Sequence, residues 1–334
     1  MSIEQLINKH ILVTGGAGFI GSNLCEALLS SGNHVVCLDN FATGKRENIA
    51  PFLSNSNFTL IEGDIRNYDD CLRAVKGAEI VFHEAALGSV PRSIKDPITT
   101  TDVNVGGFVR MLFAAKESGV KRFVYAASSS TYGDHPGLPK VEDQIGKPLS
   151  PYAITKYADE LYADNFSKLY GIETIGLRYF NVFGRRQDPE GAYAAVIPKF
   201  VKLLLNHEQP IINGDGNHSR DFTFVDNVVL ANQLAGATVN PDAVNQVYNV
   251  ACGEKNTLNQ LVANLKDFLG EYDAEIRTIS PIYGSEREGD VRHSLASIEK
   301  AQRLLGYAPL CLFKEGLQRS AEWYYQSLKT ETNH

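Results

Sequence analysis

The sequence predicts an α/β protein built on a doubly wound parallel sheet, followed by a smaller mixed α/β lobe. Short apolar runs alternate with amphipathic, helix-like runs over the first half of the chain, a pattern typical of parallel strands joined by helices. A glycine-rich turn joins the first apolar run to the first helix-like run. With 334 residues, 43% of them hydrophobic and 21% charged, the chain can bury a sizeable core.

The first predicted strand covers residues 11–14 and runs into Gly15, Gly18 and Gly21, with an amphipathic helix predicted over 22–31. Glycines at this spacing let the backbone turn tightly and come close to a pyrophosphate, whose charge the N-terminus of the following helix can meet. A glycine pattern alone is weak evidence for a nucleotide-binding site. Here strand, glycines and helix stand in the order that a dinucleotide site needs.

The second predicted strand, residues 34–39, ends in Asp39, which is followed by Asn40. An acid at this position hydrogen-bonds the ribose hydroxyls of adenosine and repels a 2′-phosphate, so the sequence predicts NAD rather than NADP as the cofactor. A nearby arginine such as Arg46 can override the preference for NAD that one acid gives, so NADP stays open as an alternative at this point.

Four more strands and three helices continue the alternation. The strands are predicted at 58–64, 80–83, 122–128 and 174–181, and the helices at 71–75, 102–118 and 151–170. The last helix has clear end signals, because Ser150 can cap it, Pro151 suits its first position and Gly171 can end it. Because the alternation then loosens, we expect a nucleotide-binding domain over 1–184 and a second lobe over 185–334, interleaved with the first.

Tyr152 and Lys156 are the strongest candidates for chemistry. They stand four residues apart on the predicted helix and therefore share one face of it. A tyrosine is a poor base at neutral pH, but a neighbouring cation favours the phenolate, which makes Tyr152 a candidate general base. Ser128 closes the strand at 122–128, and ligands of such sheets bind at the carboxyl ends of the strands. A hydroxyl there can share a proton with Tyr152.

Composition and charge argue against several functions. The formal charge of -7 does not suit a general nucleic-acid surface. The five cysteines form no C-x-x-C pair and no metal-like spacing with histidine, so we expect reduced thiols, no metal site and a cytoplasmic protein. No segment approaches the roughly 20 apolar residues of a membrane helix. Motifs typical of serine hydrolases, P-loop NTPases and zinc peptidases are absent from the sequence.

The chain resembles the extended short-chain dehydrogenase/reductases, which have a Rossmann-type fold. Within that family it is similar to the bacterial UDP-hexose 4-epimerases that prefer N-acetylated sugars, the UDP-N-acetylglucosamine 4-epimerases. The resemblance covers nearly the whole chain. It rests on the glycine loop, on the Tyr-x-x-x-Lys pair, and on the segments 126–136, 177–187, 191–198, 213–216 and 287–290.

The resemblance implies a reversible C4 epimerisation of UDP-GlcNAc to UDP-GalNAc through a 4-keto intermediate. Tyr152, with Ser128 relaying, would take the proton from the sugar 4-hydroxyl while the C4 hydride passes to NAD. Lys156 would support Tyr152 and hold the nicotinamide ribose. The keto sugar would then present its other face and take the same hydride back, so that tightly bound NAD is regenerated in each turnover.

The resemblance also assigns binding residues. Cofactor contacts are expected from Gly15, Gly18, Phe19, Ile20, Gly21, Asp39, Asn40, Thr43, Gly44, Asp64, Ile65, Ala85, Ala86, Leu87, Asn104, Tyr152, Lys156 and Tyr179. UDP-sugar contacts are expected from Gly88, Ser89, Ser128, Ser129, Ser130, Tyr152, Asn181, Ala195, Val196, Arg220, Arg287, Asp290 and Ser294. Arg220 and Arg287 match diphosphate-binding positions, where a guanidinium fork suits phosphate oxygens. Residues 185–334 would thus mainly bind the UDP-sugar.

Departures from the galactose-type epimerases bear on the substrate. Ala126 and Ala127 replace serines of the family's serine run, and Gly88 replaces a lysine. Ser294 stands where some members carry a bulky aromatic, which leaves room for a 2-N-acetyl group. The uronic acids UDP-GlcNAcA and UDP-GalNAcA remain an alternative, with Arg92 as a cation for the C6 carboxylate. The pair UDP-Glc and UDP-Gal is a further, weaker one.

Other functional classes fit less well. Nucleotide-sugar 4,6-dehydratases place an Asp-Glu pair after the strand-end hydroxyl, where this chain has Ser129 and Ser130. The loop glutamate of the sugar-nucleotide decarboxylases is also missing, so neither chemistry has its acid and base. A non-catalytic NAD-binding sensor would need none of Ser128, Tyr152 and Lys156.

A homodimer is expected by resemblance. Relatives pair through the helices that correspond to 102–118 and 152–169, and apolar positions such as Val105 and Leu112 fit one buried helix face. The expected partners are therefore a UDP-sugar and a second copy of the chain, in the biosynthesis of a polysaccharide that the sequence does not specify.

Overall fold

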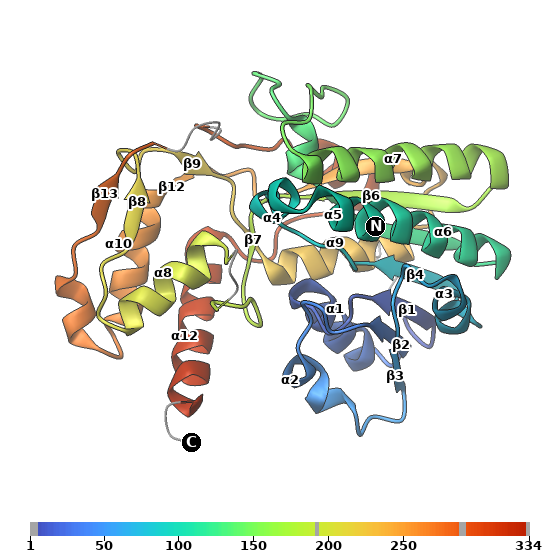
Figure 1. Ribbon diagram of the computed structural model, residues 1–334, viewed down its shortest axis with the longest axis horizontal. Helices are drawn as coiled ribbons and strands as arrows, with labels where there is room; N and C mark the ends of the chain where they lie inside the picture. Colours follow the sequence, from blue (N-terminus) through green and yellow to red (C-terminus); the bar gives the residue numbers. More distant parts are fainter. Residues whose placement is uncertain (1–5, 191–193, 287–291, 332–334) are drawn as a thin grey trace.

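The computed structural model describes residues 6–190, 194–286 and 292–331. Its centre is a seven-stranded parallel sheet in the order β11-β6-β5-β4-β1-β2-β3 (Figure 1). The strand order reverses beside β1, because β2 and β3 lie on one side of it and β4, β5 and β6 lie on the other. The predicted α/β class and doubly wound sheet are confirmed. Ligands of such sheets bind where the strand order reverses.

The strands of the sheet are short and mostly buried. Their bounds are β1 His10–Thr14, β2 His34–Asp39, β3 Phe58–Glu62, β4 Ile80–His83, β5 Arg122–Ser128, β6 Glu173–Tyr179 and β11 Gln246–Val250. The central strands are apolar on both faces, as parallel strands must be when helices cover both sides. Ser128 of β5 pairs with Tyr179 of β6, so these two strands deliver their last side chains to one edge.

Helices cover both faces of the sheet, as Figure 1 shows for α6 and α7 on one side and α1 on the other. One face carries α1 Phe19–Ser30, α9 Val225–Ala237 and α11 Glu299–Leu305, and the other carries α3 Tyr68–Val75, α6 Phe108–Glu117 and α7 Pro151–Tyr170. Each layer closes over its own apolar core. The remaining short helices are α2 Arg46–Ile49, α4 Val90–Lys95, α5 Pro97–Thr101, η1 Ala50–Phe52, η2 Asp102–Gly107, η3 Ser129–Tyr132, η4 Pro241–Ala243 and η5 Ala274–Thr278.

A second lobe lies beside the sheet (Figure 1). Its helices are α8 Val196–Leu205, α10 Leu258–Leu269 and α12 Phe313–Glu331, which enclose a separate apolar core. Three small strand pairs complete it: β7 Val182–Phe183 with β10 Thr223–Phe224, β9 Ser219–Arg220 with β12 Asn256–Thr257, and β8 Ile211–Asn213 with β13 Ile282–Gly284.

The second half of the chain also returns to the main sheet. β11 adds an edge strand beside β6, and α9 packs against α1. The sequence prediction stops at six strands and misses β11. Its five residues alternate little between apolar and polar side chains, and Asn245 and Asn249 interrupt the apolar run, so the local pattern gave little signal.

The helix predicted over 102–118 is confirmed, and it changes its hydrogen-bonding pattern along its length. Residues 102–107 form a π-helical turn between α5 and α6, and Gly107 lies in it. A Cβ at Gly107 would stand 2.5 Å from the Ile65 side chain, so the glycine allows close packing there. π-Turns inside helices are frequent at functional sites, and this one carries Asn104.

Candidate active site

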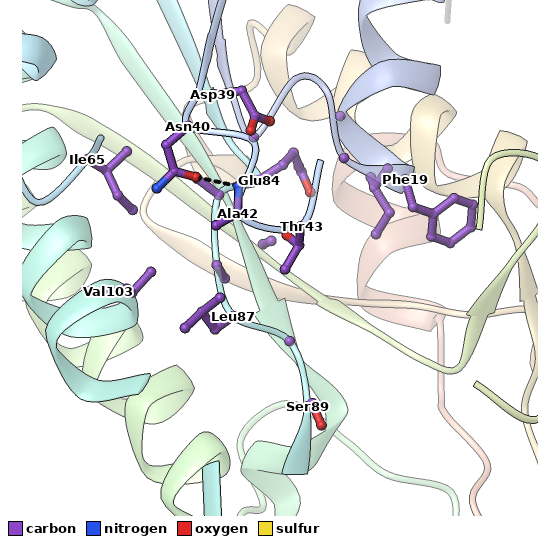
Figure 2. A pocket seen from close by; sticks show the side chains of 18 of the residues that line it. Phe19, Asp39, Asn40, Ala42, Thr43, Ile65, Glu84, Leu87, Ser89 and Val103 are labelled. Carbon is purple, nitrogen blue, oxygen red and sulfur yellow. Dashed lines mark hydrogen bonds between the residues drawn. The ribbon is translucent and has the colours of Figure 1, made fainter. Parts of the chain in front are cut away.

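A cavity of about 560 Å³ opens at the carboxyl ends of β1, β2, β4, β5 and β6. Figure 2 shows Asp39 and Asn40 toward one end of it and Ser89 toward the other. Twenty of the predicted site residues line this cavity: Gly15, Gly18, Phe19, Ile20, Gly21, Asp39, Asn40, Thr43, Asp64, Ile65, Ala85, Ala86, Leu87, Gly88, Ser89, Ser128, Tyr152, Lys156, Tyr179 and Asn181. The predicted cofactor and sugar residues thus meet in one elongated site.

The glycine loop is packed too tightly for larger residues. Gly15 has a φ of +67°, and a Cβ there would stand 2.8 Å from the backbone of Ala85. A Cβ at Gly21 would stand 2.2 Å from the Gly15 carbonyl oxygen. The loop therefore brings bare backbone to the cavity wall, directly before the N-terminus of α1. This is the arrangement that receives a pyrophosphate.

Asp39 fits the role of a ribose acceptor at the end of β2. Its Oδ2 accepts from the backbone N–H of Ala17 at 2.9 Å and its Oδ1 from that of Phe41 at 2.8 Å, which fixes the carboxylate in place. Burial raises the pKa of Asp39, while these two N–H groups oppose the rise. Gly44 does not line the cavity. A Cβ there would stand 2.9 Å from both Asp39 carboxylate oxygens, so Gly44 makes room for that carboxylate.

The end of the cavity near Asn40 is organised around Asp64. Asn40 Nδ2 donates to Asp64 Oδ2 at 2.8 Å, and Arg66 donates to both carboxylate oxygens, at 3.0 and 2.7 Å. The Arg66 guanidinium lowers the pKa of Asp64 to about 2, so the carboxylate is charged. Ile65 beside it is buried and supplies an apolar wall. A flat base can lie against such a wall while polar groups meet its edge.

Helix α7 carries the predicted catalytic pair. Ser150 caps it by accepting from the N–H of Ala153, and Pro151 occupies the first turn, as the sequence predicts. The helix starts at the cavity, so Tyr152 in its first turn lines the site and Lys156 follows one turn later. The described structure thus brings the phenol and the ammonium to one wall.

Lys156 is buried, and its ammonium is held in a fixed position. Its Nζ donates to the Ala126 carbonyl at 2.9 Å and to Asp159 Oδ2 at 3.3 Å. Burial opposes the charge on Lys156, but Asp159 and Tyr152 outweigh that effect and raise the pKa of Lys156. The site therefore holds a permanent cation beside Tyr152.

Ser128 ends β5 on the same cavity. Its Oγ accepts from the backbone N–H of Ser130 at 3.2 Å and pairs with the Ser130 hydroxyl at 2.9 Å. Ser129 and Ser130 belong to η3 and do not line the cavity. They stand behind Ser128, and Ser130 orients its hydroxyl.

Asn104 lies behind the cavity wall. Its Oδ1 accepts from the N–H of Leu87 at 2.8 Å, and its Nδ2 donates to the Leu87 carbonyl at 3.3 Å and to Thr155 Oγ1 at 3.1 Å. Leu87 lines the cavity and Thr155 is on α7. Asn104 therefore ties the loop after β4 to the helix that carries Tyr152.

Four predicted substrate residues of the second lobe do not line this cavity: Ala195, Val196, Arg220 and Ser294. Ala195 and Val196 begin α8, and Arg220 is in β9, where its guanidinium donates to the Ser219 carbonyl at 3.0 Å. Ser294 donates its N–H to that same carbonyl. Arg287 and Asp290 lie outside the described residues. Asn181 does line the cavity, and its Nδ2 donates to the Asp221 carbonyl at 2.9 Å.

The cavity has further lining residues that the sequence prediction left out: Leu38, Ala42, Gly63, Arg66, Glu84, Thr99, Val103, Ala126, Ala127, Val182 and Gln187. Glu84 carried a signal, because it directly follows a buried strand whose carboxyl end faces the site. Thr99 and Gln187 come from loops and short helices, whose positions depend on tertiary packing.

Neither a metal site nor a membrane span is found in the described parts of the chain. No group of three or more His, Cys, Asp or Glu side chains there could hold a metal ion. Across 6–190, 194–286 and 292–331, no helix combines the length and apolar character needed to cross a bilayer.

Comparison with known proteins gives a consistent result. A model of the NAD dependent epimerase/dehydratase family matches residues 11–251. The UDP-N-acetylglucosamine 4-epimerase from Methanobrevibacter ruminantium M1, solved in complex with UDP-N-acetylmuramic acid, is 38% identical, with a TM-score of 0.87, over 96% of this chain and 100% of that one. The UDP-glucose 4-epimerase of Mycolicibacterium smegmatis is 37% identical over 94% of this chain and 97% of its own length.

A third relative was solved with the cofactor. The UDP-glucuronic acid 4-epimerase from Bacillus cereus, in complex with UDP-glucuronic acid and NAD, is 32% identical. It has a TM-score of 0.86 and is matched over 95% of this chain and 99% of that one. These relatives share a reaction type and differ in the sugar that their names record.

Proposed function

This chain belongs to the NAD dependent epimerase/dehydratase family, and from that membership we propose that it reversibly inverts C4 of a UDP-linked sugar, with UDP-GlcNAc and UDP-GalNAc as the preferred pair. Its cofactor is NAD. The observation that supports the proposal best is the convergence of Ser128, Tyr152 and Lys156 on a cavity whose other end has the features of a dinucleotide site.

The residues that would hold NAD run along the cavity. The glycine loop before α1 would receive the pyrophosphate, Asp39 the adenosine ribose, and the wall at Asp64 and Ile65 the adenine. Lys156 would contact the second ribose, near Tyr179. When bound, NAD supplies a hydride acceptor that gives the hydride back within the turnover.

Tyr152 would take the proton of the sugar 4-hydroxyl and later return it from the opposite face. Ser128 would share that proton, because its hydroxyl is already oriented by Ser130. The fixed Lys156 cation stabilises negative charge that develops on the phenol oxygen during the transfer, and it does so without reorganising water. The two positions directly after Ser128, where the dehydratases carry their acid pair, are Ser129 and Ser130, which favours epimerisation over dehydration.

Inversion requires a sugar that can turn while its nucleotide stays bound. We assign the anchoring of the UDP to Asn181, Arg220, Arg287 and Asp290, with Ala195 and Val196 at the start of α8 as apolar neighbours. Gly88 and Ser89 would border the sugar, since both line the far end of the cavity. The absence of a side chain at Gly88 leaves that end open, because a Cβ there would meet no atom within 4 Å.

The choice of sugar rests on two positions. The small side chain of Ser294 supports an acetamido group, and the backbone N–H of Ser294 donates to the carbonyl of Ser219, the residue before Arg220 in β9. UDP-GlcNAcA and UDP-GalNAcA form the second candidate pair, since Arg92 on α4 follows Ser89 closely and its N–H donates to the Ser89 hydroxyl at 3.1 Å. A C6 carboxylate bound in that region would gain a cation.

A homodimer is also part of the proposal. Helices α5 and α7 expose large apolar side chains, with Ile98 at 81%, Ile154 at 57%, Leu161 at 54% and Leu169 at 65% of their full exposure. Apolar side chains gathered on neighbouring helices are typical of an interface rather than of a solvated surface. Analytical ultracentrifugation would test this directly, with Leu161→Glu expected to give monomers.

The experiment for the function uses the purified protein with no added cofactor. UDP-GlcNAc, UDP-GlcNAcA and UDP-Glc are incubated separately, and proton NMR of the anomeric region follows each to equilibrium. Fastest formation of UDP-GalNAc supports the proposal, and fastest turnover of the uronic acid favours the second candidate. No conversion of any sugar, even with NAD supplied, would refute the epimerase proposal. Tyr152→Phe is the matched control, expected to retain NAD and lose most activity.

A further inference from the structure

Glu84 is a half-buried acid that the proposed reaction does not use. It directly follows β4 and lines the same cavity as Ser128, Tyr152 and Lys156 (Figure 2). Its Oε1 accepts from the Tyr179 hydroxyl at 2.8 Å. Its Oε2 is buried and has no hydrogen-bond partner within the described structure. An ionised carboxylate is normally paired or hydrated, so a further positive charge placed beside this oxygen would stabilise the carboxylate.

Burial and the polar groups around Glu84 have opposite effects on the ionisation of its carboxyl. Burial raises the pKa of Glu84 to about 7, and the Tyr179 hydroxyl and the Lys156 cation oppose that rise only in part. Tyr179 is held from the other side by Asn232 of α9, a neutral donor at 2.8 Å. His83, the preceding residue, is neutral near pH 7, because burial lowers the pKa of His83 to about 3.

The glycine loop contributes no charge to this environment, since residues 15–20 contain no titratable side chain. A second acid of the described structure acts on Lys156, because Asp159 pairs with that ammonium and burial raises the pKa of Asp159 to about 7. Any test of Glu84 must therefore leave the Lys156–Asp159 pair unchanged.

Strand register places Glu84 beside the reacting end of the cavity. His83 pairs with Tyr125 across β4 and β5, so Glu84 follows alongside Ala126, two residues before Ser128. Ser128 in turn pairs with Tyr179, the residue that donates to Glu84. Because hydride and proton leave the same C4 group, the nicotinamide must lie at this end, near Ser128 and Tyr152. The oxidised ring carries one positive charge and the reduced ring carries none.

We propose that Glu84 selects the oxidised cofactor: its carboxyl releases a proton to solvent when NAD⁺ binds and keeps that proton when NADH binds. This inference rests on the proposed function, which places the nicotinamide beside Tyr152 and Ser128. The carboxylate attracts the positive ring and gains a counter-charge in return, whereas burying it against a neutral ring is unfavourable. Such a residue keeps the protein in the form that can accept a hydride from the next sugar.

The affinity for NAD⁺ relative to that for NADH should change with pH in one direction. Glu84 titrates near neutrality in the free protein, and a bound positive ring favours its carboxylate form. Raising the pH from about 6 to about 8 should therefore strengthen NAD⁺ binding relative to NADH binding. Each unit by which the two complexes differ in the Glu84 pKa changes the ratio of affinities about tenfold.

The test measures cofactor occupancy instead of catalysis. Holoprotein is exchanged against an excess of an equimolar NAD⁺ and NADH mixture at about pH 6, 7 and 8, and the bound nucleotides are released and quantified by chromatography. For the wild type we expect the bound NAD⁺ to NADH ratio to rise about tenfold over this range. Glu84→Gln keeps the shape and the acceptor for Tyr179 but not the charge. It should give a lower ratio with a much flatter pH dependence.

Tyr179→Phe is the second variant. It removes the hydroxyl that favours ionised Glu84, so the rise in the ratio should move to higher pH than in the wild type. An unchanged ratio and an unchanged pH dependence in Glu84→Gln would overturn the proposal, and so would equal weakening of both nucleotides, which a purely structural role predicts. Failure of the epimerase proposal would show instead as absent sugar conversion in the wild type, with the occupancy ratio still measurable.

Discussion

Replacing Asn104 by alanine tests how the wall of the active site is held. Asn104 is 1% exposed, and its amide joins both backbone groups of Leu87 to Thr155 on α7. The change would leave the Leu87 N–H without its acceptor, at a cost of about 1–3 kcal/mol, and each further lost bond would remove about 0.5–1.5 kcal/mol. With two further bonds lost, we expect the free energy of unfolding to fall by about 2–6 kcal/mol in total.

The functional effect should exceed the loss of stability. Leu87 lines the cavity and Thr155 is three residues from Tyr152, so both walls of the site shift when their link is cut. A displacement of about 1 Å between reacting groups can slow a reaction about 100-fold. Urea unfolding, NAD content after gel filtration and kcat/KM for UDP-GlcNAc are the three measurements.

Thr155→Val provides the control, because it keeps the shape of the side chain and removes only its hydroxyl. It removes the bonds of that hydroxyl with Asn104 and with the Tyr152 carbonyl, so it should cost about 1–3 kcal/mol. Its effect should add only in part to that of Asn104→Ala, since the two side chains share a bond. The reasoning is refuted if Asn104→Ala unfolds within about 0.5 kcal/mol of the wild type and keeps its NAD and its activity.

Three further predictions come from buried contacts. Gly21→Ala places a methyl group 2.2 Å from the Gly15 carbonyl oxygen and should abolish NAD retention. Gly284→Ala is the control, because its methyl group would meet no atom nearer than 3.7 Å, and this variant should retain NAD. Equal NAD content in the two variants would contradict the prediction. Arg178 donates twice to Glu160 on α7 at 2.8 and 2.7 Å, so Arg178→Met should lower the urea-unfolding free energy by about 3–5 kcal/mol, and a change below about 1 would count against it. Burial raises the Glu84 pKa from 4.5 to about 7, so the stability that protonated Glu84 contributes is complete below about pH 4.5 and is lost as pH rises through about 7. Between pH 4.5 and 7, the unfolding free energy of the cofactor-free wild type should therefore fall by about 3 kcal/mol more than that of Glu84→Gln. Parallel curves of unfolding free energy against pH would disprove this prediction.

Much of the nucleotide half of the molecule could be predicted because its signals are local. The glycine loop, the acid ending β2 and the cap of α7 each follow from a few neighbouring residues, and the structure places all three where the pattern indicates. Parallel strands also deliver their carboxyl ends to one edge, so Ser128 could be assigned to the site before any coordinates.

Features that depend on contacts between distant segments were harder to predict. β11 becomes a strand by pairing with β6. The π-helical turn before α6 carries Gly107, which packs on Ile65, and Asn104, which bonds Leu87. Gly44 was expected to touch the cofactor but makes room for Asp39. No spacing rule in a single sequence encodes these contacts.

The central claim is that a hydride leaves C4 of the UDP-sugar and returns to the same carbon on the opposite face. The most direct measurement uses UDP-GlcNAc deuterated at C4, incubated with the purified holoprotein in ordinary water and followed by NMR and mass spectrometry. The account predicts UDP-GalNAc that keeps the deuterium at C4, formed without added NAD. Loss of the deuterium to solvent, or no UDP-GalNAc at all, would contradict it.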